Sequence, residues 1–78
     1  MATDDAVNRG PGKRDTIRIY QDAAGEFRWK RMRPNGRVVS DSGEGYTDPR
    51  DARAGMRLAN DDWADPTQVR LVDHTKAD

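Results

Sequence analysis

The residues that could bind a metal or carry out acid–base chemistry are few and lie toward the end of the sequence. Asp61, Asp62, Asp65 and Asp73 supply carboxylates, and His74 is the single histidine. A zinc site usually draws on several histidine nitrogens or cysteine sulfurs, and this chain has one histidine and no cysteine. We therefore expect neither a metal site nor a bound cofactor.

A nucleophilic mechanism also lacks the residues that it requires. A serine nucleophile needs a base within hydrogen-bond reach, and histidine serves most often. Ser40 and Ser42 are the only serines, and no motif pairs either of them with His74. The sequence thus predicts no catalytic residues, and we expect a protein that is not an enzyme.

Five positively charged side chains between residues 28 and 37, with no acid among them, form a candidate nucleic-acid site: Arg28, Lys30, Arg31, Arg33 and Arg37. One interpretation is a groove for single-stranded nucleic acid, with Trp29 available for stacking. The other is a solvated outer sheet face that discourages aggregation. Alternation along a strand favours the second, because it places Trp29 on the opposite face from Arg28 and Lys30.

The glycine-rich segment from Ser42 to Tyr46 precedes an expected helix, where backbone N–H groups can bind an anion. No lysine follows at the spacing of a phosphate-binding loop, and Glu44 and Asp48 would repel an anion. We therefore interpret the glycines as serving a tight turn, with Tyr46 packed where the sheet meets the helix.

Hydrophobic periodicity predicts four strands and one helix. Alternation indicates strands over residues 16–21, 26–33, 37–41 and 68–73,. Asn35-Gly36 predicts a tight hairpin in which both turn residues adopt positive φ. Strict alternation places Arg31 on the apolar face, so either it lies beyond the edge of the core or a bulge near Met32 shifts the register.

The helix is expected from Pro49 to about residue 62, with Thr47 as its N-cap. An apolar stripe at helical spacing faces the sheet, formed by Ala52, Met56, Ala59 and Trp63,. The place of Trp63 in this stripe favours the core or a contact between two subunits, whereas an exposed tryptophan at the helix end would mark a partner site. We favour the contact between subunits.

Composition allows one small domain. Only 33% of the 78 residues are apolar and 36% are charged. We expect a disordered arm over residues 1–14, a folded domain over 15–74 and a disordered tail over 75–78. A folded domain of about 60 residues has marginal stability. Without cysteines to form disulfides, such a domain usually gains stability by oligomerisation.

The charges of the 14 basic and 14 acidic residues cancel, which argues against strong overall attraction to nucleic acid or membrane. With no long apolar run, a cytoplasmic protein is expected.

Several segments together resemble the YegP-like (DUF1508) family. The matching residues are Ile19-Tyr20, Asp22, Gly25-Glu26-Phe27-Arg28-Trp29, Asn35-Gly36, Val38-Val39, Ser42, Glu44-Gly45-Tyr46-Thr47, Ala52 and Gly55. The resemblance covers about residues 16–62. It implies a β-β-β-α-β unit that forms a homodimer, with C-terminal strands exchanged to give one continuous sheet. It implies no general biochemical activity, and the helix ending Asn60-Asp61-Asp62-Trp63 departs from the family pattern.

The sequence therefore predicts an α+β fold, with an antiparallel meander covered by one helix and a final strand that either returns to its own sheet or joins a partner's. The expected dimer interface consists of Trp63, Val69, Leu71 and Val72. The expected function is a small homodimeric binding module. Nucleic-acid binding by the basic hairpin around residues 28–37 is the alternative.

Overall fold

The computed structural model describes residues 14–76. The chain forms three consecutive strands, one helix and a final strand. The elements are β1 (Asp15–Gln21), β2 (Phe27–Met32), β3 (Val38–Asp41), α2 (Pro49–Ala59) and β4 (Val69–Asp73). The predicted α+β class and β-β-β-α-β order are confirmed. Most of the predicted arm and half of the predicted tail lie outside the described residues.

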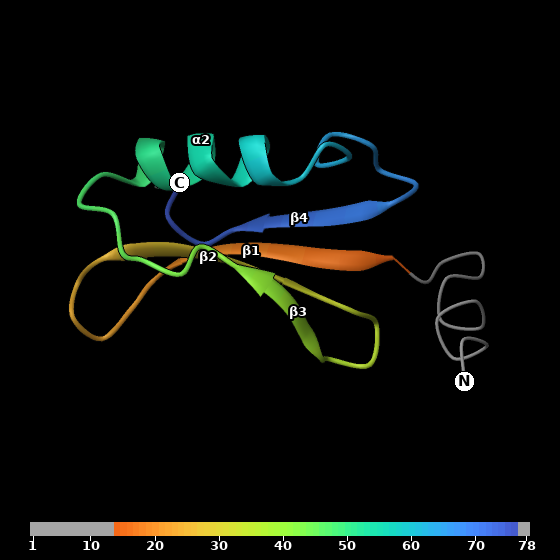
Figure 1. Cartoon of the computed structure of the whole chain (residues 1–78), viewed down its shortest axis with the longest axis horizontal. Coiled ribbons are helices and arrows are strands. Elements are labelled where there is room, and N and C mark those ends of the chain that lie inside the picture. The colour runs from red at the N-terminus through yellow and green to blue at the C-terminus, as the bar shows by residue number, and fades with distance from the viewer. Residues whose placement is uncertain (1–13, 77–78) are drawn as a thin grey trace.

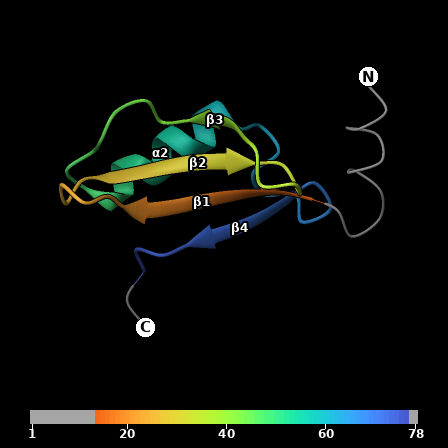
Figure 2. The ribbon, with the colours of Figure 1, turned by 90° about the horizontal axis from the view of Figure 1, so that it is seen from below.

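The four strands form one mixed sheet in the order β3-β2-β1-β4 (Figures 1 and 2). β2 runs antiparallel to both β1 and β3, as the predicted meander requires. Within the single chain β4 returns to its own sheet and pairs parallel to β1, with Thr16 beside Arg70. The chain passes through α2 on its way from the β3 edge to the β4 edge, and α2 covers one face of the sheet.

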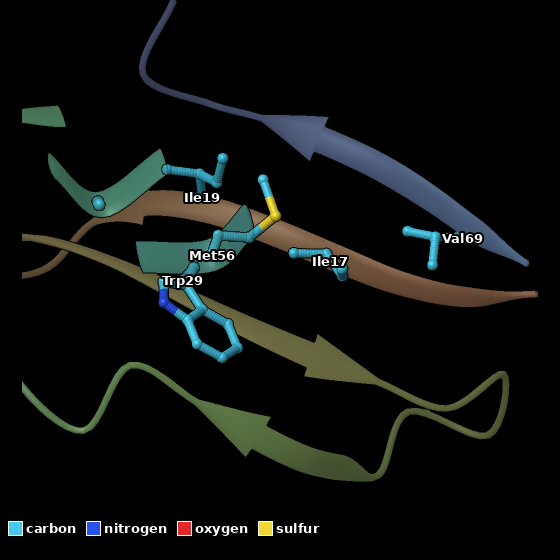
Figure 3. Packing of buried hydrophobic residues seen from close by; sticks show 6 residues of the cluster. Ile17, Ile19, Trp29, Met56 and Val69 are labelled. Atoms are coloured by element: carbon cyan, nitrogen blue, oxygen red, sulfur yellow. The ribbon is translucent and has the colours of Figure 1, made fainter. Parts of the chain in front are cut away.

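The core lies between the sheet and α2 (Figure 3). Period-two alternation directs Ile17, Ile19 and Trp29 toward the helix, and Ile19 lies directly across from Trp29. The buried apolar side chains are Ile17, Ile19, Trp29, Ala52, Met56 and Val69. Phe27, Tyr46 and Trp63 pack partly buried against them. The apolar faces of the first two strands therefore pack together against α2, and the core is small.

The hairpin between β2 and β3 differs from the predicted turn. Gly36 has a φ of 88°, but no residue other than glycine has positive φ between residues 14 and 76, so Asn35 does not adopt the predicted conformation. The Gly36 N–H donates to the Arg33 carbonyl at 2.8 Å, which makes Pro34 and Asn35 the central turn residues. Proline fixes φ near −65° and so selects this turn, which a left-handed glycine completes.

The helix begins at Pro49 as predicted, but its N-cap differs and it ends earlier than expected. Asp48, not Thr47, is the N-cap, and its carboxylate accepts a hydrogen bond from the Arg50 N–H. The helix ends at Ala59, because Asn60 turns extended and its Nδ2 donates to the Met56 carbonyl at 2.8 Å. Ala59 is therefore exposed and Trp63 lies beyond the helix, so only the first half of the predicted stripe is buried.

Candidate binding surfaces

The predicted basic hairpin does not form one surface. Arg31 lies opposite Ile17 on the face covered by α2, whereas Arg28 and Lys30 lie on the other face of the sheet. The predicted bulge near Met32 is present, but in the pairing between β2 and β3, where the register shifts. It does not turn Arg31 away from the covered face. The five charges are therefore divided between the two faces and the hairpin loop.

Arg31 forms a partly buried ion cluster at the end of the core, in which Asp15 is buried and the Asp62 side chain is 34% exposed. Its Nε donates to Asp15 Oδ2 at 3.0 Å, and its two terminal nitrogens donate to the two Asp62 oxygens at 2.7 and 3.0 Å. Nη1 also lies 3.3 Å from Asn60 Oδ1. The hydrogen bond to Asp62, followed by that to Asp15, raises the pKa of Arg31 despite its burial. The cluster joins β1 and β2 to the segment after α2, and it engages the guanidinium of Arg31 within the fold.

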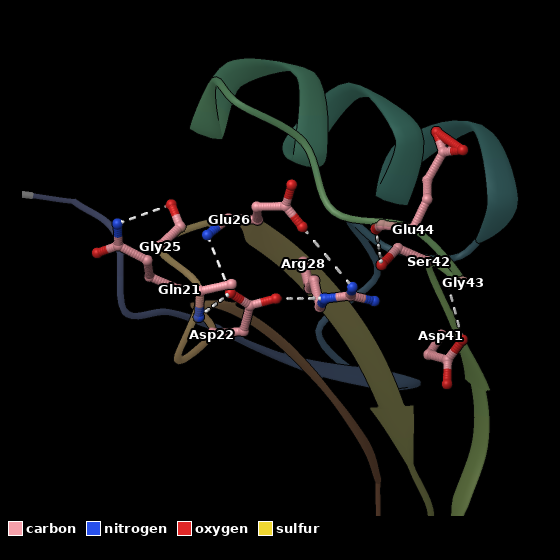
Figure 4. Close-up of polar contacts among 10 residues, drawn as sticks. Gln21, Asp22, Gly25, Glu26, Arg28, Asp41, Ser42, Gly43 and Glu44 are labelled. Atoms are coloured by element: carbon pink, nitrogen blue, oxygen red, sulfur yellow. Dashed lines mark hydrogen bonds and ion pairs between the residues drawn. The ribbon is translucent and has the colours of Figure 1, made fainter.

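Arg28 is also held within the fold (Figure 4). Its Nε donates to Asp22 Oδ2 at 2.6 Å, and Asp22 Oδ1 accepts from the Ala24 and Glu26 N–H groups. The hydrogen bond from Arg28, followed by that from Glu26, lowers the pKa of Asp22. This contact fixes the turn between β1 and β2. The charge of Arg28 is thus partly neutralised by a neighbour in the same hairpin.

The sheet face turned away from α2 carries no covering element within residues 14–76. We call it the open face, and its residues are Thr16, Arg18, Tyr20, Arg28, Lys30, Met32, Val38, Asp41, Arg70 and Val72. Lys30 Nζ lies 5.1 Å from the centre of the Tyr20 ring. Sequence reasoning missed Arg18, Tyr20 and Arg70 as candidate residues, although the alternation of β1 could have indicated the first two.

A second surface is an apolar groove beside β4, which we call the β4 groove. It encloses about 300 Å³ and is lined by Trp63, Ala64, Pro66, Val69 and Leu71. Leu71 is 40% exposed there. Three of the four residues predicted for a dimer interface therefore meet in one groove. The fourth, Val72, lies beside Arg18 on the open face.

The glycine-rich segment has the structural role that the sequence indicates. Tyr46 exchanges backbone hydrogen bonds with Phe27, at 2.7 and 2.8 Å. Its hydroxyl reaches α2, where a methyl group added at Gly55 would lie only 2.8 Å from it. Gly45 passes so close to Glu26 that a side chain would collide with it. The segment thus connects the sheet to the helix by close packing.

The acids near the C-terminal end take part in local contacts. Asp65 accepts from the Thr67 N–H at 2.9 Å, and Asp73 accepts from Arg53 Nε at 2.7 Å. Within residues 14–76 no group of three or more histidine, cysteine, aspartate or glutamate side chains is placed to hold a metal ion. None of the helices in this described range has the length and apolar character needed to cross a membrane.

Two carboxylates with lowered pKa values, those of Asp48 and Asp73, predict that the fold loses stability in acid. Hydrogen bonds from the Arg50 side chain and N–H hold the pKa of Asp48 at about 2, below its ordinary value of 3.8. Burial would raise the pKa of Asp73, but bonds from Thr75 and Arg53 outweigh burial and lower it. A carboxylate whose pKa is lower in the folded than in the unfolded state stabilises the fold at pH values above its unfolded-state pKa. This stabilisation is lost as the pH falls through its folded-state pKa. We therefore expect the melting temperature to fall between about pH 4 and pH 2.

Thermal unfolding followed by circular dichroism across this pH range measures the effect. Asp48→Asn is the matched control, because an amide still accepts the capping hydrogen bond but does not titrate. Its melting temperature should depend less steeply on pH over this window. An unchanged slope would contradict the role assigned to Asp48.

Comparison with known proteins adds one relative of known structure. No family model and no curated protein matches the chain. A protein from Haloferax volcanii, whose solution structure was determined by NMR, is 33% identical and superposes with a TM-score of 0.55. The match covers 67% of this chain and 90% of the Haloferax protein. With this identity over nearly the whole relative, the chain belongs to the same family as the Haloferax volcanii protein.

Proposed function

We propose that the chain is a non-enzymatic binding module that works as a homodimer, with the β4 strands exchanged between subunits. The observation that carries the proposal is the β4 groove, an apolar surface at a free edge of the sheet. β4 is the terminal strand of the sheet order, so its outer edge has no neighbouring strand within the described residues. Leu71 is exposed on the groove side of this edge.

A free edge and an apolar groove together favour self-association. An exposed edge strand presents unpaired backbone groups that can pair with another chain. Burying Trp63 and Leu71 would enlarge a core that consists of six buried apolar side chains among residues 14–76. Small domains without disulfides often gain stability in this way. The resemblance to the YegP-like family, which implies homodimers, supports the same conclusion.

Exchange of β4 requires little change in contacts. Within one chain β4 pairs with β1 along its whole length, and Asp73 bonds to Arg53 of α2. A strand supplied by a second chain would make the same contacts in the same register. Residues 63–68, which follow the ion cluster and lead into β4, would then act as the hinge. Trp63, Ala64 and Pro66 of the β4 groove lie in this hinge and would be repositioned between the two subunits. This is the usual logic of domain swapping, in which identical elements are exchanged.

The basic hairpin no longer supports the nucleic-acid alternative. Arg31 is used in the ion cluster and Arg28 in the turn contact. A groove that tracks a nucleic-acid backbone needs its charges on one surface. We therefore propose no nucleic-acid function for residues 28–37.

Light scattering coupled to size-exclusion chromatography tests the dimer. The chain has a mass of 8.8 kDa, and we expect a species of twice this mass. Leu71→Lys should shift the equilibrium toward monomer, because it places a charge in the β4 groove. Leu58→Lys is the matched control, since Leu58 is 86% exposed and lies outside the groove. A stable folded monomer would contradict the proposal.

A designed disulfide distinguishes exchange from other dimers. The chain has no cysteine, so Thr16→Cys with Arg70→Cys introduces one pair at neighbouring register positions of β1 and β4. Neighbouring strands bring Cα atoms within disulfide range. Exchange predicts a covalent dimer on a non-reducing gel. A monomeric band on the gel, from a sample that is dimeric by light scattering, would contradict strand exchange but not the dimer itself.

A further inference from the structure

We propose that the open face binds an acidic, partly apolar segment of a partner protein. The central observation is that Arg18, in the central part of the sheet, lies directly opposite Lys30 on β2. Arg70 lies on the same face, one strand away on β4. The inference rests on the proposed function in treating the chain as a binding module, but it concerns the face opposite the β4 groove.

Arg18 and Lys30 weaken the sheet that carries them. Like charges directly across two strands are destabilising. Arg18 Nε is buried and has no hydrogen-bond partner among residues 14–76. Asp41 stands beside Lys30 in the register with β3 and offsets part of its charge, whereas Arg18 lies one strand farther from Asp41. A carboxylate from outside the fold, placed beside Arg18, would offset its repulsion with Lys30.

Charge complementarity therefore identifies an anion as the occupant. Soluble surfaces normally intersperse both signs of charge. On the open face the cations Arg18, Lys30 and Arg70 instead outnumber the acid, Asp41. Apolar groups lie among them: Met32 follows Lys30 along β2, and Val72 lies beside Arg18 on β4. A partner segment with alternating acidic and apolar side chains matches this pattern. Such a segment would place carboxylates on the cations and aliphatic side chains on Met32 and Val72.

The same face fits nucleic acid poorly. Binding of single strands relies on aromatic rings on which bases stack. Tyr20 is the one aromatic residue of the open face, and Lys30 lies over its ring at 5.1 Å. The apolar positions are aliphatic and cannot stack on bases. The chain also has no net charge to draw in a polyanion from a distance,.

The decisive variant is Arg18→Glu, because binding and stability should change in opposite directions. A glutamate opposite Lys30 replaces repulsion by attraction, so the melting temperature should rise by a few degrees. Affinity for an acidic probe should fall on the order of tenfold, through the loss of one cation and the gain of one anion. A raised melting temperature would show that the fold is retained, so a loss of binding could not then be attributed to unfolding.

The probe is a fluorescent peptide of alternating glutamate and leucine, titrated by anisotropy at low and high salt. The matched peptide carries glutamine in place of glutamate. Arg50→Glu is the matched protein variant, because it makes the same change in net charge on the exposed surface of α2. We expect salt-sensitive binding of the acidic peptide by the natural chain and by Arg50→Glu, and weak binding of the glutamine peptide.

Three outcomes would overturn the proposal: no binding of the acidic peptide, equal binding of the glutamine peptide, or unchanged affinity in Arg18→Glu. Tighter binding of oligothymidylate than of the acidic peptide would assign the open face to nucleic acid instead. Light scattering on the same samples reports the dimer separately. A monomer that binds the peptide contradicts only the proposed dimer, and a dimer that fails to bind contradicts only the proposed ligand.

Discussion

Replacing Arg31 by alanine should lower the free energy of unfolding by about 3–5 kcal/mol, the usual cost of removing one partner from a buried ion pair. The loss is large because Asp15 is only 1% exposed and would lose its bond to Arg31. Asp62 would lose both hydrogen bonds of its bidentate contact. A domain of this size has little stability to spare, so we expect the variant to be largely unfolded at room temperature.

Urea denaturation followed by tryptophan fluorescence would measure this change, with the midpoint and the slope fitted separately. Arg37→Ala is the matched control from the same hairpin, because Arg37 is exposed. Exposed substitutions of this kind usually change stability by less than about 0.5 kcal/mol. If the two variants were equally stable, the ion cluster would make no net contribution and the pairing would be incidental.

Local patterns in the sequence were sufficient to predict the elements of this fold. Alternation of Ile17 and Ile19 with polar neighbours marks β1, and the spacing of Phe27 and Trp29 marks β2 on the same face. Such patterns depend on nearest neighbours in the chain and need no knowledge of the tertiary structure. The same alternation placed Arg31 on the covered face.

Element ends were harder to predict, because they depend on competing side-chain contacts. Asn60 ends the helix by donating to the Met56 carbonyl, a bond that helical periodicity does not reveal. Pro34 and Asn35 form the centre of the hairpin turn, whereas the Asn35-Gly36 motif favoured another turn. In both cases one residue outside the recognised pattern selected the local conformation.

Candidate surfaces depend on topology, and this explains why sequence reasoning identified them incompletely. The five charges between residues 28 and 37 are close in sequence, but strand alternation and the ion cluster divide them between two faces. The open face instead combines β2 with Arg18 of β1 and Arg70 of β4. Its composition becomes visible only when the parallel pairing of β1 and β4 is known.

The second large effect is expected at α2, where two long apolar side chains differ almost completely in exposure. Met56 is 1% exposed and lies between Ile17, Ile19 and Trp29 in the core (Figure 3). Leu58, two residues later, is 86% exposed. Replacing Met56 by alanine removes buried methylene groups and leaves a cavity, which usually costs about 2–5 kcal/mol. We expect the same order of loss here.

Leu58→Ala controls for every effect other than burial. Methionine and leucine have similar helix propensities, so both substitutions change the intrinsic stability of α2 by similar small amounts. We expect Leu58→Ala to change the free energy of unfolding by less than about 0.5 kcal/mol, measured by urea denaturation at a fixed protein concentration. Because Leu58 lies outside the β4 groove, the dimer should also be unaffected. A comparable loss in both variants would mean that the outer side of α2 is covered in the assembled protein, and the β4 groove would then not be its main contact.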